Sequence, residues 1–229
     1  LNHARAMREA AEALSLDAAG KADDLTGTVR ITASVFVAHY IMPSVVAQMR
    51  EAHPEIQLEI VPSDTSENLL YREADIAVRM YRPTQLDMVT LYLGYIQLGL
   101  FGSKSYVQRH GRPTTAEEIV KHHIIGYDRN TSMIEGFREA GMDVGREFFP
   151  VRCDNHTVTW ELVRAGAGLG FGPAPAGMSD DALVQIDFGV PLPKLEVWLT
   201  AHEAIRRSAR VDAVWKVLAA RLGEICERD

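Results

Sequence analysis

The pattern of apolar and polar positions divides the first half of the chain into alternating strands and helices. The predicted elements, in order, are a strand at 28–33, a helix that Ser34 caps and that carries Tyr40, Ile41, Val45, Val46 and Met49, a strand at 56–61, a polar turn at 63–66, a short helix at 67–72 and a strand at 74–80. Pro43 is expected near the first turn of its helix, where the missing N–H costs nothing. This order predicts a parallel sheet covered by helices.

The second half of the chain has a similar organisation. The predicted elements are an apolar strand at 93–101, a helix opening at 113–118, a strand at 123–127, a helix and turn at 137–145, a strand–helix–strand unit at 151–173, a strand at 195–201 and a terminal helix with the apolar stripe Val211, Val214, Trp215, Leu218 and Leu222. The fold class predicted is therefore α/β, with two Rossmann-like lobes and a cleft between them. The strands near 96–101 and 195–201 are the expected crossovers between the lobes.

The N-terminal residues 1–26 are predicted to form the end of a linker helix and a connector. Small apolar residues recur there at spacings of 3, 4, 3 and 4, as in a coiled-coil seam; they are Ala4, Met7, Ala11, Leu14 and Ala18. The alternative is a surface helix that lies on the domain. The two lobes are then expected at 27–100 together with 202–229, and at 101–201.

The unit at 151–173 is the most informative stretch of the chain. A β-branched run ends in the polar turn Asp154-Asn155-His156, an apolar helix follows, and a glycine-spaced strand runs from Gly168 to Gly172. The edge of a sheet where such turns lie is where open α/β folds bind small ligands. The glycines follow a helix instead of opening one, so they are not a nucleotide-binding fingerprint. This stretch predicts a small-molecule receptor and not a catalyst.

Composition narrows the class of protein. The chain of 229 residues has a net charge of −7 and a pI of about 5.6, whereas a surface that binds nucleic acid usually carries a basic patch. The arginines at 206, 207 and 210 and those at 109–112 are expected to be solvated charges, so these residues alone are not expected to bind DNA. No apolar run approaches the ~20 residues that span a bilayer, and no signal-peptide pattern is present, so no membrane partner and a cytoplasmic location are expected.

The chemistry-bearing residues do not form a catalytic or metal-binding pattern. Two widely spaced cysteines, Cys153 and Cys226, suggest a reducing compartment. Cys153 and His156 have the spacing of half a zinc site, but no second pair of ligands accompanies them. No nucleophile, base and orienting group can be assigned together. We therefore expect no enzyme activity, no metal and no cofactor.

Four segments give the chain a family resemblance. They are GTVRITASVFVAHYIMPSVVAQMREAHPEIQLEI at 27–60, EADIAVRM at 73–80, ELVRAGAGLGFGPAPAG at 161–177 and LPKLEVWLTAHEAIRRSARVDAVWKVLAARL at 192–222. In their order and spacing they resemble the effector-binding domain of LysR-type transcriptional regulators, over about residues 20–222. The resemblance implies a fold like that of type 2 periplasmic binding proteins, with an effector cleft. It also implies a homodimer or homotetramer, and DNA binding only through an N-terminal helix-turn-helix domain that this chain lacks.

The resemblance also implies where an effector is held. Turns that precede helices present free backbone N–H groups to an anion, and the corresponding turns of the family line the effector pocket. The contacts implied in this way are Ser34, Val35, Ser63, Thr65, Asn155 and Thr157. By its position at the end of the third strand, Arg79 is a candidate partner for a carboxylate. The residues expected to face the cleft from the second lobe are Gly102, Asn130, Phe171 and Gly172. The effector is expected to be a small molecule, with carboxylates among the candidates.

Each of these assignments has a structural alternative. Ser34 and Thr65 are also suited to be ordinary helix N-caps, Arg79 to pair with Asp75 or Asp87, and Phe171 to belong to the core. At the level of function, the leading hypothesis is the sensor domain of a bacterial transcription regulator. The alternative is a solute-binding protein of a transport system, which uses a similar fold.

Overall fold

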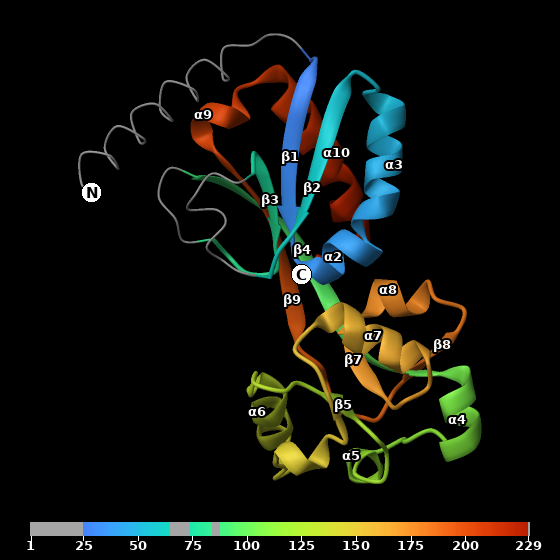
Figure 1. Ribbon diagram of the computed structural model, residues 1–229. Coiled ribbons are helices and arrows are strands. Elements are labelled where there is room, and N and C mark those ends of the chain that lie inside the picture. Colours follow the sequence, from blue (N-terminus) through green and yellow to red (C-terminus); the bar gives the residue numbers. More distant parts are fainter. Residues whose placement is uncertain (1–24, 65–73, 84–87, 229) are drawn as a thin grey trace, which may run out of the picture. The chain divides into compact units, whose positions relative to one another are not determined.

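The computed structural model describes residues 25–64, 74–83 and 88–228, which form two compact units (Figure 1). Unit 1 comprises residues 1–95 and 196–229, and unit 2 comprises residues 96–195. The chain passes from one unit to the other within β4 (Met88–Ser103) and again within β9 (Lys194–His202). The predicted lobe boundaries, after 100 and after 201, lie within the same two strands.

Several predicted features lie outside the described residues. These are the linker helix at 1–19, the short helix at 67–72 and the candidate contact Thr65. Within the described ranges, no helix has both the length and the apolar character needed to cross a bilayer.

The sheet of unit 1 is built on three parallel strands (Figure 1). β1 (Gly27–Ala33) lies between β2 (Ile56–Pro62) and β3 (Ile76–Arg79) and is parallel to both. The predicted parallel sheet is therefore confirmed for these strands. The sheet is mixed overall, because β9 pairs with β3 in the antiparallel direction.

The helix predicted after Ser34 is in fact two helices. α2 (Val35–Tyr40) ends where the backbone N–H of Ile41 donates to the carbonyl of Val37, and α3 (Met42–Ala52) starts one residue later. Pro43 explains the break, since its ring has no N–H and clashes with a carbonyl four residues earlier in a continuous helix. The single-helix prediction was wrong at this point, although Pro43 does lie in a first turn.

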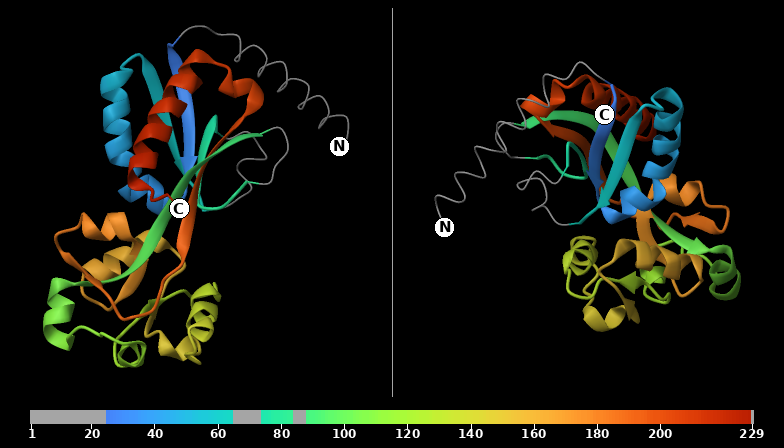
Figure 2. Two further views of the ribbon diagram at one scale, coloured as in Figure 1. Left: turned by 180° about the vertical axis from the view of Figure 1, so that it is seen from behind. Right: turned by 45° about the horizontal axis from the view of Figure 1, so that its top comes forward.

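The C-terminal helix completes the core of unit 1. α10 (Ala209–Ile225) follows the short α9 (Glu203–Arg206) and contacts α3 and β1; seen from behind in Figure 2, it lies across the sheet. All the residues of the predicted apolar stripe are buried: Val211, Val214, Trp215, Leu218 and Leu222. Burying side chains of this size contributes roughly 1.5–3 kcal/mol each, so α10 is a major part of the stability of unit 1.

Unit 2 has two small groups of strands. β4 pairs in the antiparallel direction with β7 (Gly170–Pro173) and with β8 (Leu183–Ile186). β5 (Ile125–Gly126) pairs in parallel with β6 (Val151–Arg152). On its other side, this short sheet continues through a parallel bridge between Ile124 and Leu169, so the chain at 124–126 lies between the two strand segments that flank the helix predicted at 158–165.

Short helices cover unit 2. They are α4 (Lys104–His110), α5 (Ala116–Ile119), α6 (Ser132–Glu139), the 3₁₀ turn η2 (Arg146–Phe148), α7 (His156–Arg164) and α8 (Ala174–Met178). The helix predicted at 137–145 therefore begins and ends earlier than expected. The side chain of Asn130 accepts a hydrogen bond from the N–H of Ser132 at its start, and Gly141, with φ +82°, follows its end.

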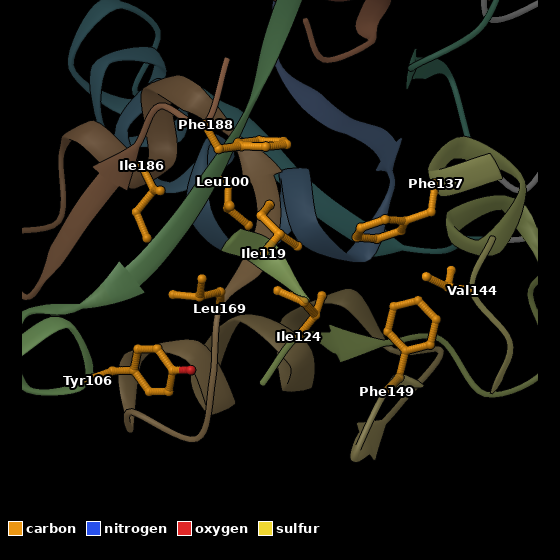
Figure 3. Close-up of a cluster of buried hydrophobic side chains, with 10 residues drawn as sticks. All are labelled: Leu100, Tyr106, Ile119, Ile124, Phe137, Val144, Phe149, Leu169, Ile186 and Phe188. Atoms are coloured by element: carbon orange, nitrogen blue, oxygen red, sulfur yellow. The ribbon is translucent and has the colours of Figure 1, made fainter. Parts of the chain in front are cut away.

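The core of unit 2 is rich in aromatic rings. Figure 3 shows ten of its buried side chains, among them Tyr106, Phe137, Phe149 and Phe188. The rings of Phe137 and Phe149 meet edge to face with centroids 5.9 Å apart, the geometry that aromatic pairs prefer. This packing holds α6 against the segment before β6, which matters for the cavity described below.

Candidate functional site

The turn after β1 brings several predicted contacts together in unit 1. The Oγ of Ser34 accepts a hydrogen bond from the N–H of Val37 at 3.4 Å and caps α2. The N–H of Ser63 donates to the carbonyl of Ala33 at 2.8 Å. Ser34, Val35 and Ser63 are therefore close neighbours, as the sequence predicted, and the N-cap alternative for Ser34 is also confirmed.

An unpredicted carboxylate lies at this turn. The N–H of Val35 donates to Oδ1 of Asp64 at 3.0 Å, so the anion that this N–H was expected to attract is already supplied by the protein. Asp64 directly follows Ser63, one of the predicted contacts. An acidic residue placed just after a strand was the only signal in the sequence that could have identified it.

Arg79 ends β3 as a buried cation with an incomplete set of partners. Its side chain is in a residue only 4% exposed; Nη1 donates to the carbonyl of Val78 at 3.2 Å, while Nη2 has no hydrogen-bond partner. Burial lowers the pKa of Arg79, and Tyr81 and Asp64 partly offset that effect. A buried donor left unpaired costs roughly 1–3 kcal/mol, and an oxygen atom of a ligand would satisfy it.

The alternative prediction for Arg79 was an ion pair with Asp75 or with Asp87. The carboxylate of Asp75 accepts the backbone N–H of Arg30 at 2.8 Å, and burial raises the pKa of Asp75. No hydrogen bond or ion pair joins Asp75 to Arg79 within the part of the chain that the structure describes. Asp87 lies outside the described residues.

In unit 2, one carboxylate organises two of the predicted turns. Oδ1 of Asp154 accepts the backbone N–H groups of Asp128 at 2.8 Å, Arg129 at 3.1 Å and Asn130 at 3.3 Å. Desolvation acts to raise the pKa of Asp154, but these backbone donors outweigh it and the pKa is lowered. Asp154 thereby joins the loop that carries Asn130 to the turn that carries Asn155.

The start of α7 contains a polar atom without a partner. Oδ1 of Asn155 accepts the N–H of Val158 at 3.0 Å and caps the helix. Thr159 donates to the carbonyls of Cys153 and Asn155, whereas the Oγ1 of Thr157 is buried and has no hydrogen-bond partner. Thr157 is thus placed, like Arg79, to gain a hydrogen bond from a bound molecule.

The predicted glycine contacts serve close packing. A Cβ atom on Gly102 would lie 2.6 Å from Leu169 Cδ2, and one on Gly172 would lie 2.3 Å from Trp160 Cζ3. Both glycines thus face buried side chains, and neither presents free space on that side. Phe171, which lies opposite Leu100 in the pairing of β4 with β7, is half-buried and has ring contacts with Phe137 and Phe188.

Phe171 also lines a cavity that the sequence did not predict. The cavity lies within unit 2 and has a volume of about 740 Å³. Its walls come from α6, from β7 and from the segment at 188–195, and Figure 3 shows two of the residues concerned, Phe137 and Phe188. The segment at 188–195 has no periodic pattern of apolar residues, and the helix that forms the other wall was predicted to start at residue 137 instead of 132.

The thiols and one histidine of the predicted half zinc site have the following surroundings. Cys153 and Cys226 are both free thiols, and burial raises the pKa of Cys226 to about 11, which keeps it protonated. The ring of His156 stacks on Tyr127, with centroids 5.1 Å apart. Among the described residues, no three metal-ligating side chains lie close enough together to hold a metal ion.

Two arginines of the basic cluster near the C-terminus form ion pairs with neighbouring carboxylates. Arg206 pairs with Asp212, and its guanidinium lies 4.7 Å from the ring centroid of Trp215. Arg207 pairs with Glu203 at 2.6 Å. The third arginine of this cluster differs from these two, because its Nε atom is buried without a hydrogen-bond partner (Arg210).

Comparison with known protein families decides the assignment. The model of the LysR substrate binding domain matches residues 22–223. The chain belongs to this family. The regulatory domain of CrgA, a LysR-type transcriptional regulator from Neisseria meningitidis, has the same fold, with a TM-score of 0.73 at 16% identity over 86% of this chain and 99% of that one.

Other relatives of this LysR domain are regulators as well. The full-length virulence activator AphB of Vibrio cholerae superposes with a TM-score of 0.71 at 17% identity, covering 94% of this chain and 76% of that chain. In sequence, CrgA of N. meningitidis serogroup C (strain 8013) is 25% identical over 107 residues, which are 47% of this chain and 36% of that protein. The matched part of the LysR domain thus spans just over a third of the length of this curated relative.

Proposed function

We propose that this chain is the effector-sensing domain of a transcription regulator. The observation that carries the proposal is the LysR family match over residues 22–223, since the relatives described above are regulators. Binding of a small molecule changes the equilibrium between conformations, and it does so only to the extent of its differential affinity for them. DNA recognition is assigned to a helix-turn-helix domain of the regulator and not to this domain. The regulator acts as a homodimer or homotetramer in the cytoplasm.

The buried Arg79 supports an acidic effector in unit 1. Its unpaired Nη2 lies at the end of β3, and its charge is within range of Asp64, which sits at the turn that carries Ser34 and Val35. A carboxylate would pair with the guanidinium and receive the missing hydrogen bond. A receptor needs no nucleophile or base, and the residues at this turn supply hydrogen bonds and charge only. We therefore assign binding and not catalysis to this domain.

A thermal-shift screen tests the proposal. The chain is mixed with a panel of small organic acids, amino acids and aromatic metabolites, and a ligand specific to the folded state raises the Tm with concentration. We expect a hit whose Tm rise disappears in Arg79→Met, which removes the charge and keeps the volume. Arg30→Met is the matched control, because Arg30 is an exposed arginine of unit 1 that pairs with Glu59 at 2.9 Å. A panel without a single hit would contradict the proposal.

The alternative of a solute-binding protein is not retained. The relatives described above are regulators, and none of the observations in either unit favours transport.

A further inference from the structure

The cavity in unit 2 has the dimensions of a small-molecule site. Its volume of about 740 Å³ falls within the ~300–1,000 Å³ typical of ligand pockets. α6 contributes Met133 and Phe137, β7 contributes Phe171, and the segment after β8 contributes Phe188 and Leu192. Side chains from three separate parts of the unit therefore line one common space.

The lining favours an aromatic occupant. Phe171 meets Phe137 edge to face, with centroids 6.0 Å apart and an interplanar angle of 75°. It meets Phe188 in the same manner, at 6.5 Å and 64°. Aromatic rings in this arrangement present both edges and faces, so a further ring can pack among them with favourable geometry.

The charge of the cavity lining disfavours an acidic occupant. Among the described residues that line the cavity, none is a lysine, an arginine or a histidine, and the ionisable ones are Tyr127 and Glu139. Moving a carboxylate from water to an apolar site without a cation costs far more than a hydrogen bond returns. The exposed carboxylate of Glu139 would add repulsion. This chemistry is opposite to that of Arg79 in unit 1.

Tyr127 is a residue of the cavity wall that carries a hydroxyl group. Its ring is held by stacking on His156 at 5.1 Å and an interplanar angle of 14°. Burial raises the pKa of its hydroxyl, so the group stays a hydrogen-bond donor at neutral pH. No hydrogen bond within the described ranges uses this hydroxyl, which leaves it available to a ligand.

We infer that the cavity of unit 2 binds an uncharged aromatic molecule that carries a hydroxyl group able to pair with Tyr127. The inference rests on the proposed function in one respect, the binding of small molecules, and it names the class of ligand for this unit. It differs from that proposal in the chemistry it assigns, because the acid expected near Arg79 has no counter-charge here.

A matched set of probes tests the ligand class. Binding of 2-naphthalenemethanol, 2-naphthoate and 2-naphthylmethylammonium to the chain is measured by isothermal titration calorimetry at pH 7.5. The three compounds share one ring system and differ in charge. We expect the alcohol to bind at least ~10-fold more tightly than the carboxylate, because only the carboxylate has to be buried as an unpaired charge. Equal affinities, or tightest binding by the ammonium compound, would overturn the inference, as would no binding of the alcohol.

Two variants test the location. An ideal Cβ on Gly136 meets no atom within 4 Å, and Gly136 lines the cavity on α6, so Gly136→Leu fills part of the space and favours the helix. Gly223→Leu makes the same change in α10, where an added Cβ also has room, and is the control. We expect the alcohol to lose affinity in Gly136→Leu and to keep it in Gly223→Leu.

Tyr127→Phe provides a second, milder test. We expect this variant to weaken binding of the alcohol and to leave 2-methylnaphthalene, which has no hydroxyl, unaffected. Unchanged binding of the alcohol in both Gly136→Leu and Tyr127→Phe would overturn the assignment of the cavity. An acid from the screening panel that still binds Gly136→Leu supports the proposed function independently, so the two failures are distinguishable.

Discussion

Arg79 of unit 1 and the apolar cavity of unit 2 present opposite surfaces to a small molecule. The first is a buried cation with an unpaired N–H group, whereas the second is lined by aromatic and aliphatic side chains. The carboxylates of the two units differ as well. Asp154 of unit 2 is saturated by backbone N–H donors, while Asp64 of unit 1 contributes charge near an unsatisfied arginine. If both proposals hold, the two units of one domain favour different ligand chemistry, and the specificity of one unit does not predict that of the other.

The largest effect is expected from the packing of unit 2. Gly172→Val places a side chain where a Cβ alone would lie 2.3 Å from Trp160, and overpacking of this kind costs about 1–3 kcal/mol or more. Urea denaturation measures the loss in the free energy of unfolding. In a Trp160→Leu background, which removes the ring, the same substitution should cost less. Equal costs in both backgrounds would show that Trp160 is not what excludes a side chain at this position.

The next prediction concerns unit 1 and the variant Arg79→Met. Removing a buried charge with incomplete partners, and keeping its volume, should raise the free energy of unfolding by about 1–2 kcal/mol, while the acidic ligand loses affinity. Thermal and urea denaturation of the variant, compared with Arg30→Met, measure the first effect. A destabilised Arg79→Met variant would mean that the guanidinium holds β3 in place, and the contrast with unit 2 would be lost.

Ser34→Ala tests whether the turn of unit 1 is a cap or a ligand contact. The hydrogen bond from Val37 to Ser34 is 3.4 Å long, so its loss should cost about 0.5 kcal/mol, at the low end for an N-cap. A much larger loss of ligand affinity than of stability, measured by calorimetry and urea denaturation, assigns the hydroxyl to binding. Equal small losses leave Ser34 as a cap only.

The smallest expected effect is a dependence on pH in unit 2. Burial, and then the nearby His110, lowers the pKa of His122, whose Nδ1 lies 3.4 Å from the hydroxyl of Tyr106; His123 acts in the same direction and Glu118 against it. The unfolded chain therefore takes up a proton at higher pH than the folded one. The part of the free energy of unfolding that depends on His122 is fully present above about pH 6.5. It decreases as the pH drops below that value.

The variant His122→Gln tests this dependence. Its Tm should vary less than that of the wild type between about pH 5 and pH 7, because a glutamine does not titrate. His202→Gln is the control: His202 lies at the start of α9 in unit 1, where Nδ1 accepts the N–H of Ala204. If the Tm profiles of the wild type and His122→Gln coincide, then the titration of His122 does not affect folding.

The elements with strong periodicity could be predicted from the sequence. The apolar stripe of α10 follows from a spacing of about 3.6 residues. The strand β1 that precedes Ser34 follows from a spacing of about 2 residues. Both predictions agree with the structure. The division of the helix at Ile41 is a local effect of Pro43 that outweighed an uninterrupted apolar pattern. The start of α6 depends on a side-chain hydrogen bond from Asn130, which periodicity does not report.

Some of the candidate contacts could also be predicted from the sequence, and others could not. Turns that follow strands could be identified from residue type, and Ser34, Val35 and Ser63 do come together. The cavity could not, because one wall is the segment at 188–195, whose prolines, Pro191 and Pro193, give it neither a helical nor a strand period. The role of Asp154 depends on backbone N–H groups more than twenty residues away, a long-range contact that no local pattern encodes.

Unit 2 is one continuous stretch of chain, whereas unit 1 is assembled from two stretches that flank it. During synthesis on a ribosome, residues 96–195 emerge together and can fold as a unit. The sheet of unit 1 must wait for β9 and for the buried stripe of α10, which are made last. The nascent protein therefore carries an incompletely covered β-sheet until translation reaches α10, and a ribosome stalled before that point would leave β1 without the C-terminal helix that packs on it.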